Sequence, residues 1–132
     1  MSELEVITPS KAAFNGKVIS VTVPGTKGNF QILENHAPIL SSLDIGVIKI
    51  VDDSNKKMYF ATSGGTVEVL NNKITILAET FENKDEIDVN RAEAAKKRAE
   101  ERLSKRKQEN IDTLRAELAL KRAINRLKVH NS

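Results

Sequence analysis

The sequence changes character abruptly after Lys84, and this change limits what the chain can fold into. All six Gly, all three Pro and all five aromatic residues lie in residues 1–84, and residues 85–132 contain none of them. The charge divides at the same point: residues 1–84 carry 8 Lys/Arg against 9 Asp/Glu, and residues 85–132 carry 13 against 9. Because a short segment without aromatic side chains hardly builds a core of its own, the second part must pack on another surface. We therefore expect two domains, 1–84 and 85–132.

The first domain has the pattern of short β-strands separated by turns. Apolar and small polar residues alternate with a period of two in 18–23, as in a strand with one buried face. We expect strands at 4–8, 18–23, 30–33, 47–51, 58–62, 66–70 and 73–77. Asn15-Gly16 predicts a hairpin turn, because both central residues of such a turn need a positive φ. Many short strands at hairpin spacing indicate an all-β sandwich or barrel.

The second domain changes to a helical period. Asp88 is a candidate N-cap, and the residues that follow are mostly the strong helix formers Ala, Glu, Lys and Arg. A narrow apolar seam is formed by Ala92, Ala95, Ala99 and Leu103. Residues 108–112 interrupt the pattern, with Asn110 or Asp112 as a second cap, and another helix follows from about Thr113 to Val129. The pattern predicts two antiparallel helices, or one long helix if the interruption straightens.

The second expected helix has apolar residues on two sides. Ala116, Leu120, Ala123 and Leu127 share one face, and Ile111, Leu114 and Leu118 lie nearly opposite. Such a helix needs two partners at once or different partners at different times. One interpretation is a helix held permanently between the first helix and the β domain. The other is a helix that exchanges docking surfaces.

Composition excludes several classes of function. Without Cys the sequence has no disulfide framework, thiol nucleophile or cysteine zinc site. The two histidines, His36 and His130, suggest no Ser/His/Asp set and no metal site, and no phosphate-binding glycine loop precedes a helix. No secretory signal is visible at residues 1–5, and no apolar run approaches the roughly 20 residues that cross a bilayer. We expect a soluble intracellular protein without catalytic activity of its own.

Arginines form a stripe along each expected helix. The first stripe is Arg91, Arg98 and Arg102, and the second is Arg115, Arg122 and Arg126. If the helices fold as a hairpin, the stripes come near each other, and like charges held close are unfavourable unless an anion lies between them. The forked donors of Arg suit the oxygens of a phosphate, and Asp88 can accept a hydrogen bond from a ribose or an adenine amino group. The alternative is a solvated face whose arginines pair with neighbouring glutamates.

Nucleic acid is a third candidate partner for the second domain. Its surplus of four positive charges is of the kind that binds the phosphates of a nucleic acid. However, nine acidic residues are interspersed, and the domain has no aromatic side chain to stack on a base. We therefore expect no nucleic-acid binding.

Four segments of the sequence carry a resemblance to a known family. They are Val6–Pro9, Gly28–Ser41 (GNFQILENHAPILS), Ser63–Val69 (SGGTVEV) and Ala116–Ala123 (AELALKRA). Together with the alanine-rich first helix, they resemble the epsilon subunit of the F-type ATP synthase over essentially the whole chain. One departure is Gln31, where many members carry Gly.

The resemblance implies an α+β fold, an N-terminal antiparallel β-sandwich followed by a two-helix antiparallel hairpin. It implies a non-catalytic subunit of the central stalk that binds the gamma subunit and rests on the c-subunit ring. The loop formed by Glu34, Asn35, His36, Ala37 and Pro38 would face the ring. From the residues alone, His36 is an ordinary turn residue. By the same resemblance, the protein would be peripheral on the cytoplasmic face of the inner membrane, held there indirectly.

The resemblance also implies a regulatory role for the helices. Retracted, they lie on the β-sandwich; extended, they rise along gamma toward the alpha and beta subunits and inhibit ATP hydrolysis. The residues available for that inhibitory contact are Arg115, Lys121, Arg122 and Arg126. The alternative is a purely structural coupling subunit with a fixed hairpin and no nucleotide site.

Some bacterial members of the family bind ATP on the retracted hairpin without hydrolysing it. Their motif, Ile/Leu-Asp-x-x-Arg-Ala, matches Ile87, Asp88, Arg91 and Ala92. Further family positions fall on Glu82, Arg98, Arg122 and Arg126. The resemblance therefore predicts ATP as a regulatory ligand, with or without Mg²⁺, and neither a required cofactor nor a metal site.

Overall fold

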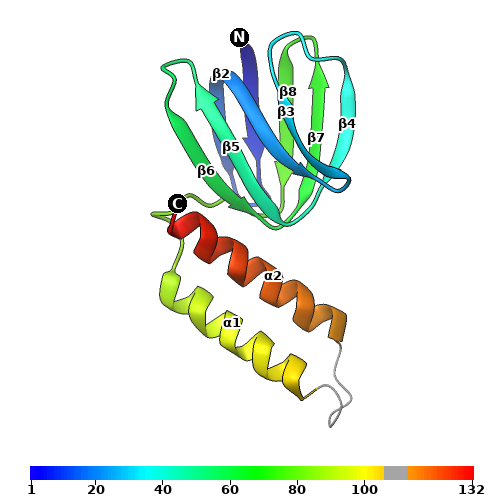
Figure 1. Ribbon diagram of the computed structural model, residues 1–132. Helices are drawn as coiled ribbons and strands as arrows, with labels where there is room; N and C mark the ends of the chain where they lie inside the picture. The colour runs from blue at the N-terminus through cyan, green and yellow to red at the C-terminus, as the bar shows by residue number, and fades with distance from the viewer. Residues whose placement is uncertain (106–112) are drawn as a thin grey trace.

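The computed structural model describes residues 1–105 and 113–132, which form a β-sandwich with a helical hairpin at one end (Figure 1). The strands are β1 (Ser2–Ile7), β2 (Ala12–Gly25), β3 (Gly28–Ile32), β4 (Ile39–Leu43), β5 (Gly46–Asp52), β6 (Lys57–Thr62), β7 (Gly65–Leu70) and β8 (Lys73–Ala78). The helices are α1 (Val89–Ser104) and α2 (Thr113–His130). The predicted interruption at 108–112, with its caps Asn110 and Asp112, lies outside the described residues, as does Ile111.

The sandwich consists of two layers that share one long strand. The layer that contains β6 has the order β3–β2–β5–β6, and the other runs β2–β1–β8–β7–β4. The first half of β2 pairs with β1, and the second half pairs with β3. The predicted sandwich is confirmed. One pair differs from a purely antiparallel arrangement, because β1 and β8 run parallel. Those two strands are not joined by a hairpin, so no short turn forces them to run in opposite directions.

Two details of the strand prediction differ from the structure. Asn15-Gly16 is not a turn but lies within β2, opposite Glu5 and Leu4 of β1. The chain reverses earlier, between Thr8 and Lys11, whose backbones exchange hydrogen bonds of 2.9 and 3.3 Å. The strand β4 was not expected, because Ile39–Leu43 follows a proline and contains two adjacent serines.

The core of the sandwich is aliphatic. Inward-facing residues of neighbouring strands in the sheet have no exposed surface, for example Leu4 and Val6 of β1 and Ile74 and Ile76 of β8. One aromatic pair closes the end of the core nearest the helices, where the rings of Phe60 and Phe81 stack with their centroids 4.0 Å apart. The residues up to Phe81 therefore form a hydrophobic core without any side chain of the helices.

The helices form the predicted antiparallel hairpin, and in this structure they are not one long helix. Asp88 caps α1, since its Oδ1 accepts a hydrogen bond of 3.0 Å from the backbone N–H of Arg91. In Figure 1, α2 lies between the sandwich and α1, and its sandwich contacts are with β5 and β6. Four of the six buried residues of the two described helices are alanines, namely Ala92, Ala99, Ala116 and Ala123.

The two predicted apolar sides of α2 correspond to these two neighbours. Ala116, Ala123 and Leu127 are buried on one side. On the opposite side, Asn125 and Val129 contact the sandwich, while Leu114, on that same side, is 65% exposed. In this structure α2 therefore packs on α1 and on the sandwich at the same time. Near its N-terminus, the side of α2 that faces the sandwich is exposed at Leu114.

Candidate functional site

A pocket of about 420 Å³ lies where the segment after β8 meets both helices. Its lining residues are Glu82, Glu86, Asp88, Arg91, Ala92, Ala95, Arg98 and Arg126. Six of the eight residues predicted to bind ATP are among them. The pocket thus collects residues from three segments that are up to 44 positions apart in the sequence.

The first turns of α1 arrange one wall of this pocket. Arg91 and Arg98 are seven residues apart, which is about two helical turns, so they project from the same side of α1. Ala92 and Ala95 line the wall with them. Because the alanine side chains are small, space remains beside the two guanidinium groups.

The pocket is lined by three carboxylates and three arginines, but only one pair among these described side chains is in direct contact. Glu82 accepts a hydrogen bond of 2.8 Å from Nε of Arg126, and both side chains are about one third exposed. Glu86 lies 3.6 Å from Nζ of Lys11. Among the described residues, no ion-pair partner is found for Arg91 or Arg98. Two forked cationic donors therefore face the pocket and are free to bind an anion.

Two predicted residues do not line the pocket. Ile87 is 7% exposed and packs with Ala61 and Val129, so it joins the hairpin to the sandwich. Arg122 is half-buried on α2, one turn before Arg126. Two lining residues were missed as ligands: Glu86, which no pattern distinguished, and Ala95, which the apolar seam contained without indicating a pocket.

Polar contacts hold α2 against the sandwich. Nζ of Lys121 lies 3.0 Å from Oδ2 of Asp44, and the side-chain amide of Asn125 donates a 2.7 Å hydrogen bond to the carbonyl oxygen of Gly46. The hydrogen bond from Lys121 and a second from the backbone N–H of Ile45 lower the pKa of the Asp44 carboxyl. Lys121, expected to serve an extended helix, is thus engaged in the docked one.

The loop formed by residues 34–38 lies at the end of the sandwich away from the helices (Figure 1). Asn35 has a φ of 61° and shares two hydrogen bonds with Asn72, of 2.6 and 3.0 Å. Glu34 pairs with the N-terminal amine, and Nδ1 of His36 is 2.7 Å from the carbonyl oxygen of Ala37. The loop is mostly exposed and is tied to the β7–β8 turn.

Residues 1–105 and 113–132 contain neither a metal-binding cluster nor a helix that could span a membrane. No group of three or more His, Asp or Glu side chains in these ranges is placed to hold a metal ion. Neither helix there combines the length and apolar character needed to cross a membrane.

Two family descriptions match the chain. Residues 1–84 match "ATP synthase, Delta/Epsilon chain, beta-sandwich domain", and residues 85–131 match "ATP synthase, Delta/Epsilon chain, long alpha-helix domain". A sandwich followed by helices, with no gap between the matches, therefore defines a delta/epsilon-type subunit of an ATP synthase.

Curated relatives narrow this class further. The ATP synthase epsilon chain of Pelotomaculum thermopropionicum is 50% identical over 103 residues, covering 78% of this chain and 76% of the relative. The epsilon chain of Salinibacter ruber is 42% identical over 108 residues, covering 76% and 72%. The chain belongs to the family of bacterial ATP synthase epsilon chains.

Solved structures share the fold. A chain of the Euglena gracilis mitochondrial ATP synthase (OSCP/F1/c-ring) matches with a TM-score of 0.80 at 19% identity, covering 98% of this chain and 80% of that one. A chain of the Tetrahymena thermophila mitochondrial ATP synthase (central stalk/c-ring) matches with a TM-score of 0.61 at 20% identity, covering 98% and 93%. At these identities the likeness extends to the fold alone.

Proposed function

We propose that the protein is a non-catalytic central-stalk subunit of a proton-translocating ATP synthase. Its sandwich binds the gamma subunit, and the Glu34–Pro38 loop contacts the c-subunit ring. The protein is peripheral, on the cytoplasmic face of the inner membrane, and reaches the membrane only through the complex. Family membership supports this assignment, as does the exposure of the loop at the end of the sandwich away from the helices.

We further propose that the docked hairpin binds ATP as a regulatory ligand. The observation that carries this is the pocket itself, in which Arg91 and Arg98 face a space of about 420 Å³, within the usual range for small-molecule sites. These two arginines would hold the phosphates. The carboxylate of Asp88, one oxygen of which caps α1, would accept from an amino or hydroxyl group. A phosphate near Arg126 must compete with Glu82.

ATP can shift the hairpin only if it prefers the docked state. At a concentration about 100 times its dissociation constant, a ligand that binds only one state stabilises that state by about 2.7 kcal/mol. The proposed pocket meets this condition, because its walls come from both helices and from the segment after β8. Undocking or opening the hairpin would separate these walls.

Calorimetric titration of the full chain with ATP, with and without Mg²⁺, tests the site. We expect Arg98→Ala to weaken binding at least tenfold, because a charge-assisted hydrogen bond contributes about 1.5–3 kcal/mol. Arg102→Ala is the matched control, since Arg102 belongs to the same helix stripe but does not line the pocket. No binding at millimolar ATP, or equal effects of the two variants, would contradict the proposal.

In the undocked state, α2 is proposed to extend toward the alpha and beta subunits and to inhibit ATP hydrolysis. Its 18 residues span about 27 Å at 1.5 Å per residue. Arg115, Lys121, Arg122 and Arg126 would then meet acidic groups of those subunits. The second candidate function is a purely structural coupling subunit with a fixed hairpin, which the contacts of Lys121 and Asn125 favour.

A reversible covalent link separates the two functions. Because the sequence contains no Cys, an Ala61→Cys/Val129→Cys pair would be the only site of disulfide formation in this subunit. The two residues belong to the same small apolar cluster between β6 and α2. If α2 must undock to inhibit, oxidation should raise ATP hydrolysis by the reconstituted complex, and reductant should reverse it. A fixed hairpin predicts no response. The single Ala61→Cys variant controls for other effects of oxidation.

A further inference from the structure

The outer edge of β6 is open over part of its length. β6 is the last strand of its layer and pairs with β5 from Lys57 to Thr62. On its other side it is bonded at Ala61, which exchanges backbone hydrogen bonds of 2.8 and 3.1 Å with Glu82. After Glu82 the chain turns away, since the backbone N–H of Glu86 donates to the carbonyl oxygen of Asn83.

The backbone of β6 continues to face outward beyond that point. In an antiparallel strand, residues two apart direct their N–H and C=O groups to the same side. Because Ala61 bonds outward to Glu82, Tyr59 and Lys57 present their backbone groups to the same side. Within residues 1–105 and 113–132, these outward groups have no hydrogen-bond partner. They offer an extended peptide the donors and acceptors of one more strand.

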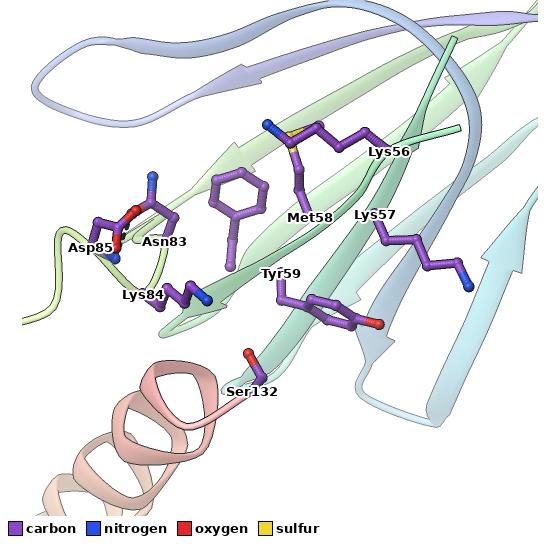
Figure 2. A pocket seen from close by; sticks show the side chains of 9 residues that line it. Lys56, Lys57, Met58, Tyr59, Asn83, Lys84, Asp85 and Ser132 are labelled. Carbon is purple, nitrogen blue, oxygen red and sulfur yellow. Dashed lines mark hydrogen bonds between the residues drawn. The ribbon is translucent and has the colours of Figure 1, made fainter. Parts of the chain in front are cut away.

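A pocket of about 420 Å³ lies along this edge, where such a strand would run (Figure 2). Met58 and Phe60 contribute apolar surface, and Lys56, Lys57 and Lys84 contribute positive charge. These lysines have no ion-pair partner in the described part of the chain. Asp85 is the one carboxylate side chain in the lining. The side chains along the edge therefore carry a net positive charge.

We propose that the edge of β6 binds an extended acidic segment of a partner protein by β-strand addition. Figure 2 shows the side chains of Lys56 and Lys57 pointing in different directions. Three lysines spread along an edge suit carboxylates that are spaced along a strand better than one compact anion. The same lysines oppose pairing with a second copy of this chain, because the edge would place like charges opposite each other. This inference does not depend on the nucleotide site.

The test uses the full chain and a capped peptide that alternates valine and glutamate over six residues. We expect the peptide to slow amide hydrogen exchange at Lys57 and Tyr59, because their N–H groups become bonded. A capped peptide that alternates valine and lysine should bind at least tenfold more weakly. Equal binding of both peptides, or protection elsewhere on the chain, would overturn the proposal.

Two substitutions at one position separate backbone pairing from side-chain contact. Tyr59→Pro removes the outward N–H at an edge position where proline is tolerated, and Tyr59→Ala keeps it. We expect at least tenfold weaker binding to the proline variant than to the alanine variant; equal affinities would overturn the proposal. Should the proline variant not fold, Lys56→Glu/Lys57→Glu must instead reverse the preference toward the lysine peptide. Dimerisation of the free chain through β6 would also overturn it.

Discussion

Asp44 connects two segments that are far apart in the sequence. Its carboxylate accepts from Lys121 on α2 and from the backbone N–H of Ile45, which lowers its pKa. Both partners of the ion pair are about half exposed, so the pair contributes at most about 1 kcal/mol to the docking of α2. This solvent-screened ion pair is therefore a weak contribution to docking beside the Asn125 hydrogen bond and the contacts of Val129.

This pair gives docking a dependence on pH. A carboxyl whose pKa is lowered in the docked state stabilises that state above its ordinary pKa, and the contribution disappears as the pH falls through the lowered value. We expect Lys121→Met to raise the pKa of Asp44 toward its ordinary value, as measured by NMR titration of the carboxyl carbon. Lys128→Met changes an exposed lysine two helical turns beyond Lys121 that forms no ion pair with Asp44 in the described structure, and it should leave that pKa unchanged. An unchanged Asp44 pKa in Lys121→Met would show that Ile45 alone holds the carboxylate.

At the scale of elements, the β7–β8 pair depends on one glycine. Gly65 opens β7 with a φ of +148°, and a Cβ built there would lie 2.0 Å from the carbonyl oxygen of Leu77. The two backbones approach so closely at this point that no other residue fits without moving β8. This requirement matches the Ser63–Val69 segment on which the family resemblance rests.

We expect Gly65→Ala to lower the free energy of unfolding by about 3 kcal/mol or more, because it combines backbone strain with a clash against backbone atoms. Gly28→Ala is the control. Gly28 also has a positive φ, +124°, but a Cβ there would meet no atom within 4 Å, so the loss should be about 1–2 kcal/mol. Urea unfolding measures both, and equal losses would show that the Leu77 contact relaxes freely.

The whole molecule contains two apolar clusters of unequal size. The large one lies entirely within the sandwich and ends at Phe81. The small one joins Ala61 of β6 to Ile87 and Val129 of the hairpin. Most contacts of α1 are with α2, and α2 alone contacts the sandwich extensively. The sandwich therefore has its own core, and the hairpin depends on it.

We expect residues 1–84 to fold alone with a cooperative thermal transition. Their stability should be lower by about 1–3 kcal/mol, because removing Ile87 and Val129 exposes apolar surface on β5 and β6. Residues 85–132 alone should show little helix by circular dichroism, since short helices need packing partners. A disordered 1–84 fragment would mean that the hairpin completes the core.

The helical part of the fold could be predicted closely from the sequence. Asp88 and the spacing of small residues act locally, so α1 begins directly after the expected cap, and α2 spans Thr113–His130 where Thr113 to Val129 was expected. α1 ends at Ser104, a few residues before the expected interruption at 108–112. Asn15-Gly16 shows the opposite case. Its local preference for a turn is overridden by pairing with β1, and such pairing depends on residues outside any short window.

The candidate site divides in the same way. Its arginines were indicated by helix periodicity and by the family resemblance. No sequence pattern indicated that Glu86 lines the pocket, because its position depends on the turn after Glu82. The Lys121–Asp44 pair joins residues 77 positions apart, and no pattern in one sequence selects that lysine over its neighbours. The sequence indicated that α2 packs on two surfaces, but the Lys121–Asp44 pair across the domains could not be predicted from it.

The parallel pairing of β1 with β8 has a consequence for how the chain folds as it is made. The second strand that pairs with β1 is β8, which begins at Lys73. At a synthesis rate of about 5–20 residues per second, β8 begins to emerge roughly 3 to 13 s after β1 has been made. During that time β2 can pair with one edge of β1. The backbone groups of the other edge are unpaired and could bind a strand of another chain. Glu3 and Glu5 alternate with the buried Leu4 and Val6 along that strand. Their charges would repel other nascent chains until β8 arrives.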